Sequence, residues 1–246
     1  IIATLGALSY GALARRLPES GGEYLFLSHT LHPSAGYVAG WISFLVGFAA
    51  PLAASAYAFG EYSRGWWPPA DPRLTGTALI LLFTALHAAH VGRGARVHNL
   101  GVALNLIVLL SLVLLAAPRL AMPAPQALGP APLATFGVSL MWVSYSYAGW
   151  NAAVYLGGEV RDPARNLPRS LLLGTGLVTA LYLGLNTVFL LGAPAAAITG
   201  QLDIGRIAAQ SLGGPAWAAG VGGLIAFALA LSVSSFVMAG PRVCAQ

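Results

Sequence analysis

Six long apolar segments separated by short polar junctions constrain the fold more than any other feature of this sequence. They cover residues 36–62, 74–91, 97–117, 135–158, 170–192 and 214–240, and a shorter one precedes them at 1–14. A helix that crosses a bilayer needs about 20 apolar residues. Only 8% of the residues are charged, against about 25% in soluble domains. The sequence therefore predicts an all-α membrane protein with a single transmembrane domain over residues 1–246.

The two ends of the chain and its cationic residues narrow the class further. The chain begins at Ile1 inside an apolar run and stops at Gln246 shortly after another. We therefore expect an internal part of a longer polytopic protein. All 12 basic residues are Arg, which excludes a lysine Schiff base and a Walker-type lysine within these residues. The single Cys244 predicts no disulfide within the chain, and we expect no cofactor.

The distribution of arginine predicts how the chain is oriented in the membrane. The net charge of +5 does not indicate a nucleic-acid partner, because the arginines lie in short junctions between apolar segments. Lys and Arg are enriched in cytoplasmic loops, so the richer set of alternate junctions is predicted to be cytoplasmic, in the plasma membrane. That set is Arg15, Arg16, Arg93, Arg96, Arg161, Arg165, Arg169 and Arg242, whereas the opposite junctions hold Arg64, Arg73, Arg119 and Arg206.

The stretch 144–151, with the sequence SYSYAGWN, is the most unusual part of any apolar segment. It lies in the middle of 135–158, so a spanning helix would place it near the bilayer centre. Polar side chains and a glycine at that depth fit a helix that is broken to line a cavity. They also fit a polar packing face between helices. On these eight residues alone, the packing interpretation is favoured.

Shorter features predict the connections between the spans. Residues 23–30 and 202–212 are predicted to form short helices outside the spans. A kink is expected near Pro51, and the Pro- and Ala-rich residues 117–134 predict an irregular connection. Residues 159–169 form a compact polar turn, in which Asn166 and Pro168 are expected to start the next helix.

Two pairs of histidines are spaced i, i+3, namely His29 with His32 and His87 with His90. A shared helix face would allow each pair to bind a metal, but no carboxylate or thiol lies beside either pair to complete the ligand set. We interpret them as interfacial histidines whose polar tips reach water near helix ends. No metal site is predicted.

Three motifs together carry a resemblance to a known family. They are LGALSYGALA at 5–14 running into LPESGGEY at 17–24, YSYAGWN at 145–151 with EVRDPARNLPR at 159–169, and MAGPRV at 238–243. In order and spacing, across the whole chain, they resemble the amino acid–polyamine–organocation (APC) superfamily of transporters. The resemblance implies an inverted-repeat helix bundle with a partial second span, spans three to eight, and a sixth span broken at its midpoint. It also implies that half of the binding site lies in a first span outside this sequence.

The resemblance assigns roles to residues of the stretch 144–151 and to one later helix. Tyr145 matches an aromatic gate, and the backbone of its neighbours is implied to hold the substrate's ammonium group through carbonyl dipoles. Gly149 is implied to permit the break and Trp150 to begin the inner half-helix. The implied substrate-binding residues are Tyr145, Ser146, Tyr147, Ala148, Gly149 and Trp150.

The resemblance also identifies three candidate residues for coupling of transport to an ion. Ser234 and Ser235 fall where related folds place hydroxyls on a coupling sodium, although helix packing is the favoured interpretation of these hydroxyls. Asn105 stands where many relatives have a lysine, and an amide does not titrate. Proton coupling through that position is therefore not expected, and exchange or coupling elsewhere is favoured.

The sequence as a whole predicts a secondary transporter or exchanger of amino acids or related amines, and not an enzyme. Its partners would be a small-molecule substrate and membrane lipid. The alternatives are an intramembrane hydrolase or acyltransferase, for which no Gly-x-Ser-x-Gly motif is present, and a seven-helix protein that does not transport. The transporter hypothesis predicts that regular helical hydrogen bonding is lost between about residues 144 and 150.

Overall fold

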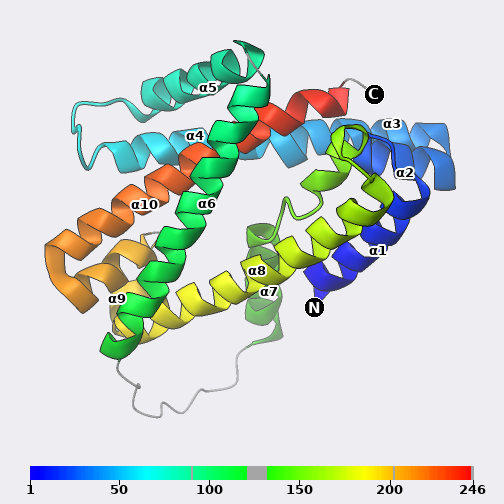
Figure 1. Ribbon diagram of the computed structural model, residues 1–246. Helices are drawn as coiled ribbons and strands as arrows, with labels where there is room; N and C mark the ends of the chain where they lie inside the picture. The colour runs from blue at the N-terminus through cyan, green and yellow to red at the C-terminus, as the bar shows by residue number, and fades with distance from the viewer. Residues whose placement is uncertain (90, 121–131, 202, 245–246) are drawn as a thin grey trace. The chain divides into compact units, whose positions relative to one another are not determined.

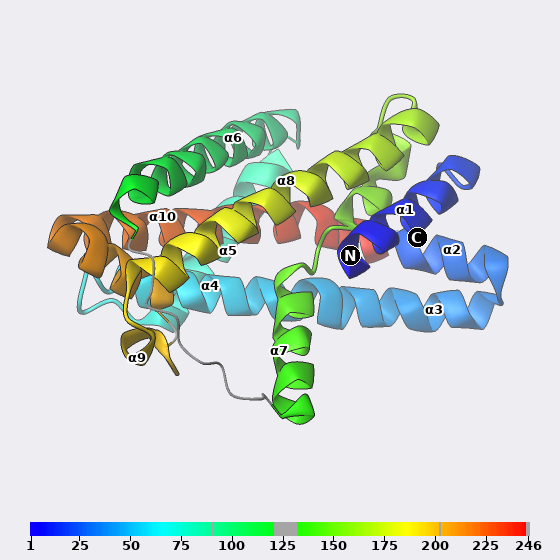
Figure 2. The ribbon, with the colours of Figure 1, turned by 90° about the horizontal axis from the view of Figure 1, so that it is seen from below.

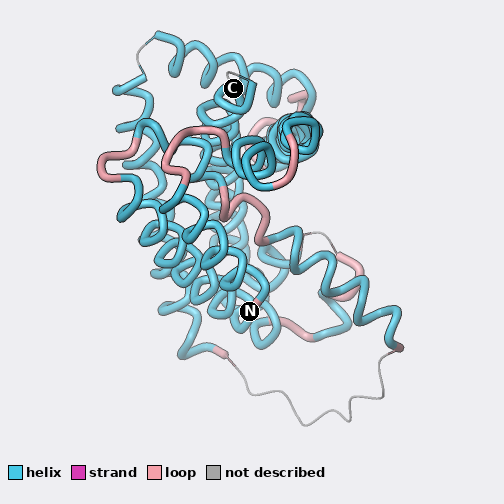
Figure 3. The backbone as a smooth tube through the Cα atoms, turned by 90° about the vertical axis from the view of Figure 1, so that its right-hand side faces the viewer, coloured by secondary structure: helices cyan, strands magenta, loops and turns pink. Residues whose placement is uncertain are grey.

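In the computed structural model, every regular element within the described residues 1–89, 91–120, 132–201 and 203–244 is a helix (Figures 1 and 3). This confirms the predicted all-α class. The α-helices are α1 (Ile2–Arg16), α2 (Gly22–Thr30), α3 (Pro33–Ile42), α4 (Ala50–Ser63), α5 (Pro72–Ala89), α6 (Val91–Ala116), α7 (Leu133–Ser146), α8 (Pro163–Gly192), α9 (Ala195–Ile198) and α10 (Ile204–Cys244). A π-helix, η1 (Ser43–Ala49), and two 3₁₀-helices, η2 (Ala117–Arg119) and η3 (Ala152–Glu159), complete them.

The chain divides into two compact units, each built from separate parts of the sequence. Unit 1 contains Ile1–Ala49, Ala124–Thr179 and Ala239–Gln246, whereas unit 2 contains Ala50–Pro123 and Ala180–Met238. All three motifs of the family resemblance therefore fall mainly in unit 1, although they are widely separated along the chain.

Five of the described helical stretches are long and apolar enough to cross a membrane. They are Pro33–Ser63, Pro72–Ala89, Arg96–Arg119, Pro163–Gly192 and Ile204–Val243. Each contains most of one predicted apolar segment, which confirms a multi-pass membrane protein. Many of their large apolar side chains are exposed, among them Leu100, Leu114 and Leu173, as expected where lipid rather than protein surrounds a helix.

Two helices begin earlier in the chain than the sequence predicted. α6 begins at Val91 and α8 at Pro163, each several residues before its apolar run. Proline is favoured in the first turn of a helix, where its missing N–H needs no partner. The prediction that Asn166 and Pro168 start this helix is wrong, because Asn166 Nδ2 instead donates to the Arg161 carbonyl within the turn, at 2.6 Å.

The long spans contain two irregularities. The π-helix η1 ends two residues before Pro51, in the span Pro33–Ser63, and a proline inside a helix removes one backbone hydrogen bond. The kink expected near Pro51 stays a prediction. Within α10, Gly214 has φ 75° and ψ −163°, so a short helix from Ile204 precedes the span proper, as predicted.

The remaining connections agree with the sequence where the structure describes them. α2 confirms the short helix predicted at 23–30. Of the connection predicted at 117–134, residues 121–131 lie outside the described residues, and 117–119 form η2.

Candidate functional site

The helix through the stretch 144–151 is broken, as the transporter hypothesis predicted. α7 ends at Ser146 (Figure 2), and in the turn beyond it i→i−3 hydrogen bonds replace the i→i−4 pattern. The Tyr147 N–H donates to the Ser144 carbonyl at 3.2 Å, and the Ala148 N–H donates to the Tyr145 carbonyl at 2.9 Å. Gly149 then adopts φ +97°, a conformation that side-chain-bearing residues rarely take. The packing interpretation, which needs a continuous helix, is therefore not favoured.

The chain beyond the break differs from the expected inner half-helix. It begins at Ala152 rather than at Trp150, and it is the 3₁₀-helix η3 rather than an α-helix. The segment contains Gly157 and Gly158 just before its last residue, and glycine is among the weakest helix formers. Val154 and Tyr155 in this segment are buried, so tertiary packing fixes its path in place of regular α-helical bonding.

Residues of the first motif that lie just before α2 contact the chain segment that follows the break. The Gly158 N–H donates to Ser20 Oγ at 2.8 Å. A Cβ built on Gly157 would lie 2.6 Å from the Glu19 carbonyl oxygen, so only glycine permits this approach of two backbones. Two motifs separated by more than a hundred residues thus contact each other.

Glu23 joins three segments of unit 1 through its carboxylate. Oε1 accepts a hydrogen bond from the Tyr10 hydroxyl of α1 at 2.9 Å, and another from Asn151 Nδ2 in the turn after the break. Oε2 is also buried and has no hydrogen-bond partner in the described structure. A hydrogen bond to a charged group is worth about 1.5–3 kcal/mol, so Glu23 is well placed to fix the geometry of the broken segment. Sequence reasoning missed this role, although both residues stood in the quoted motifs.

Trp150 is held by α1. Its ring meets the Tyr10 ring edge-on at 4.9 Å between centroids, and a Cβ built on Gly6 would lie 2.6 Å from its Cζ2. The indole therefore occupies the space left by a glycine of the first motif, which orients the backbone at the break.

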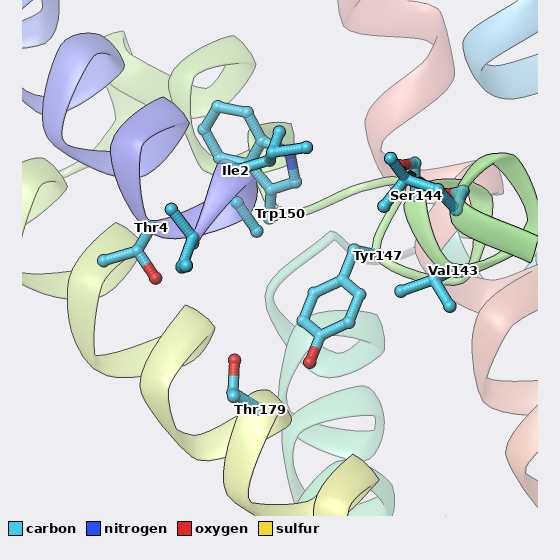
Figure 4. Close-up of a pocket in the computed structure, with 10 residues that line it drawn as sticks. Ile2, Thr4, Val143, Ser144, Tyr147, Trp150 and Thr179 are labelled. Carbon is cyan, nitrogen blue, oxygen red and sulfur yellow. Dashed lines mark hydrogen bonds between the residues drawn. The ribbon is translucent and has the colours of Figure 1, made fainter. Parts of the chain in front are cut away.

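A pocket of about 500 Å³ opens beside the broken segment (Figure 4). Its wall is mostly apolar, and it carries a few hydroxyl groups, with Tyr147 and Thr179 pointing toward each other from two segments (Figure 4). This combination of apolar lining and few polar groups is typical of small-molecule sites. The lining residues are Ile1, Ile2, Ala3, Thr4, Leu140, Val143, Ser144, Tyr147, Trp150 and Thr179.

The structure brings only part of the predicted substrate-binding set to this pocket. Tyr147 and Trp150 line it. Tyr145 is 59% exposed and meets Trp142 edge-on at 6.4 Å on α7, so its role as a gate stays a prediction. Ser146 Oγ donates to the Val143 carbonyl at 2.7 Å, and Ala148 is exposed in the turn.

An ion pair joins the third motif, at Arg242, to the second motif, at Glu159. The Arg242 guanidinium donates to both carboxylate oxygens of Glu159, from Nε at 2.5 Å and from Nη2 at 3.0 Å. This interaction holds the pKa of the Glu159 carboxyl below its usual value. The bidentate geometry favours one orientation of the two chain segments.

The coupling-ion candidates lie in unit 2 and contact histidines. Ser234 Oγ lies 2.9 Å from His87 Nε2 and 3.2 Å from His98 Nδ1. The interpretation of His87 as interfacial is therefore wrong, since it is only 8% exposed. Asn105 Oδ1 is buried and has no hydrogen-bond partner among the described residues. Among the described residues, neither Ser234 nor Ser235 forms a hydrogen bond with Asn105.

The other histidines have different surroundings. His29 and His32 are exposed, and His32 Nδ1 accepts from the Ser34 N–H at 3.2 Å, which caps the start of α3. His90 lies outside the described residues.

A broken helix beside a pocket, in an all-α multi-pass protein, is the arrangement that many transporters with discontinuous helices use to form a substrate site. A family model described as "Amino acid permease" matches residues 1–246. The chain belongs to this family.

This chain matches only part of the length of each of the following relatives. The b(0,+)-type amino acid transporter 1 of Mus musculus is 30% identical over 201 residues, which are 77% of this chain and 41% of the relative. An uncharacterized transporter of Mycobacterium bovis is 30% identical over 98% of this chain and 56% of its own length. The large neutral amino acids transporter small subunit 2 of Oryctolagus cuniculus is 26% identical over 77% of this chain and 38% of its own. The chain thus spans about half the length of the curated relatives it matches.

Proposed function

We propose that the full-length protein is a secondary transporter or exchanger that moves amino acids, or related amines, across the plasma membrane by alternating access. The observation that carries this proposal is the end of α7 at Ser146, followed by Gly149 at φ +97° beside a pocket. Membership of the amino acid permease family and the printed names of the relatives support the choice of substrate class.

The chemistry of the pocket suits a zwitterion with an apolar side chain. The carboxyl end of α7 carries a partial negative charge from carbonyls that lack helical partners, and this charge attracts an ammonium group. The apolar wall formed by residues such as Ile2, Leu140 and Val143 accepts a side chain, and the hydroxyls of Thr4 and Tyr147 offer hydrogen bonds to polar atoms. No covalent step is required of any residue, so the proposed activity is transport without catalysis.

Movement of the broken segment would open and close access to the substrate. Its inner side is attached to α1 and α2 through Glu23 and Tyr10, so we expect these elements to move with it. The arginine-rich junctions around Arg15, Arg96 and Arg165 are proposed to face the cytoplasm, in accord with the positive-inside rule. Tyr145 remains the candidate gate, and Tyr147 is a second aromatic on the same turn.

Uptake by the full-length gene product tests the proposal. The purified protein is reconstituted in liposomes and supplied with a panel of labelled neutral, aromatic and cationic amino acids. We expect accumulation of at least one class above protein-free liposomes, and a reduction in Tyr145→Ala. Absence of uptake and of counterflow for the whole panel, with the protein folded and inserted, would refute the proposed function. Equal uptake by Tyr145→Ala would remove only the gate role.

A further inference from the structure

Four side chains from three helices of unit 2 form a continuous buried chain that the proposed substrate site does not use. His87 of α5 reaches Ser234 of α10 at 2.9 Å, and Ser234 reaches His98 Nδ1 of α6 at 3.2 Å. His98 Nε2 then lies 3.2 Å from Ser235 Oγ. His87 and His98 are each 8% exposed and Ser234 is 1% exposed. The order of contacts is therefore His87–Ser234–His98–Ser235, and we call it the histidine–serine chain.

The surroundings of the histidine–serine chain are apolar. Val233, next to Ser234, forms a core cluster with Ala56 and Leu79. The Phe83 ring stacks on the His87 ring at 6.3 Å. Ionisable side chains placed inside membrane-spanning helices are costly, and they mark ion or proton sites by default. Apolar side chains would fill this space equally well, so packing alone does not explain why two imidazoles lie here.

The charged side chains that the structure describes on the helices packed here are paired with other residues or exposed. On α4, Glu61 pairs with Arg64 at 3.6 Å. On α6, Arg96 is exposed, two residues before His98. On α5 the charged residue is Arg73. On α10, Arg206 pairs with Asp203, and Arg242 pairs with Glu159. The titratable groups of the histidine–serine chain itself are its two imidazoles.

Counting donors and acceptors shows how many protons the chain accommodates. A serine hydroxyl has one donor and two acceptor positions, and a neutral imidazole has one of each. With both rings neutral, Ser234 donates to one ring and accepts from the other, so both of its contacts within the chain are satisfied. With one proton added, His98 donates from both ring nitrogens to Ser234 and Ser235, and Ser234 donates to His87. The proton can move to His87 by reversal of the Ser234 hydroxyl, again with every contact kept.

A second proton does not fit this arrangement. Both rings would then direct an N–H at Ser234, whose own O–H would lose its acceptor within the chain. Two positive charges would also share one apolar site, where charge repulsion is stronger than in water. The geometry therefore has a capacity of a single proton, held by whichever ring carries two N–H groups.

We propose that His87, Ser234, His98 and Ser235 form a one-proton binding site, and that its occupation is linked to substrate movement. The proton comes from water, binds a nitrogen lone pair of one imidazole, and can leave from the other ring after the Ser234 hydroxyl reverses its direction. The site needs no titratable group at Asn105. The linkage to transport rests on the proposed function, whereas the proton site itself does not.

The first test measures the proton site directly, independently of transport. Nuclear magnetic resonance of ring-labelled histidine in the full-length protein, in detergent micelles, follows the signals of His87 and His98 between about pH 4 and 9. We expect both rings to shift in a single shared transition. Ser234→Ala should break this common transition, whereas Ser232→Ala should not, because Ser232 Oγ donates only to the Ala228 carbonyl of its own helix, at 3.1 Å, in the described contacts. Two independent transitions in the unmodified protein, no shift of either ring, or no difference between the variants would overturn the site.

The second test measures the linkage. Uptake of a labelled amino acid by proteoliposomes is compared with and without an inward proton gradient. We expect several-fold stimulation by the gradient in the unmodified protein and in Ser232→Ala, and loss of this stimulation in Ser234→Ala and His98→Gln. If the proton gradient does not change the uptake rate of the unmodified protein, the proposed linkage between proton binding and transport is refuted. If no amino acid is taken up at all, the proposed function fails, and the histidine titration still decides the proton site.

Discussion

Replacement of Gly149 by alanine tests whether the broken backbone is the basis of function. The residue has φ +97°, and a left-handed or similar conformation costs a residue with a side chain about 1–2 kcal/mol. No atom lies within 4 Å of a Cβ built at this position, so steric contact with neighbours adds nothing. Alanine also favours a helix over glycine by about 1 kcal/mol. Both effects act against the break and in favour of a continuous helix.

The combined bias toward a continuous helix is about 2–3 kcal/mol, which corresponds to a change of roughly 30- to 140-fold in the equilibrium between the two backbone states. We expect Gly149→Ala to weaken substrate binding and uptake at low substrate concentration by up to this factor. Binding is measured by substrate-induced thermal stabilisation of the purified protein, and uptake is measured in liposomes. Gly149→Asn should lie between alanine and glycine, because asparagine tolerates positive φ better than other residues.

Gly137→Ala is the matched control. Gly137 lies in the same helix, α7, with helical backbone and no atom within 4 Å of an added Cβ. Alanine there should leave uptake unchanged and stabilise the protein by up to about 1 kcal/mol. Equal substrate binding and uptake in Gly149→Ala and Gly137→Ala would refute the reasoning, since the break would then not matter to the substrate.

Three further changes probe the contacts around the site. Gly157→Ala should destabilise the protein by about 1–3 kcal/mol in thermal unfolding, because its Cβ would clash with a backbone carbonyl, whereas Gly174→Ala, with open space, should not. Tyr147→Phe should reduce uptake several-fold with unchanged folding, and unchanged uptake would exclude its hydroxyl from binding. Arg242 lowers the pKa of Glu159, so this pair stabilises the protein above the usual carboxyl pKa and loses that effect as the pH falls through the lowered value. Glu159→Gln should cost less than about 1 kcal/mol at pH 7, since the pair is exposed, and should abolish this acid-side loss of thermal stability.

The sequence predicted the helical class from local chemistry, whereas the break was implied by the family resemblance, because residues 144–151 alone favoured the packing interpretation. Long apolar runs separated by arginine junctions leave few alternatives to membrane helices. Gly149 among hydroxyl side chains weakens a helix at one place, and the structure ends α7 three residues before it. The early starts of α6 and α8 were not predicted, because the apolar runs that located these helices begin several residues after the helices themselves.

The contacts that hold the break in place could not be predicted from a local pattern. Asn151 and Glu23 are 128 residues apart, and His87 and Ser234 are 147 residues apart. Each residue alone has an ordinary local explanation, such as an interfacial histidine or a small residue at a helix contact. Their chemistry depends on which helices are neighbours, and periodicity within one helix does not contain that information.

The break and the histidine–serine chain can be perturbed separately, so a double-mutant cycle can show whether they work together. Gly149→Asn acts on unit 1 and Ser234→Ala on unit 2. Changes at independent sites have additive free energies, so their effects on the uptake rate under an inward proton gradient should multiply. If protonation drives the movement of the broken helix, the loss from Ser234→Ala should be smaller when Gly149→Asn has already impaired that movement. A double variant whose rate equals the product of the single effects would separate proton binding from the substrate step. A rate clearly above that product would show that proton binding and the movement of the broken helix belong to the same conformational change.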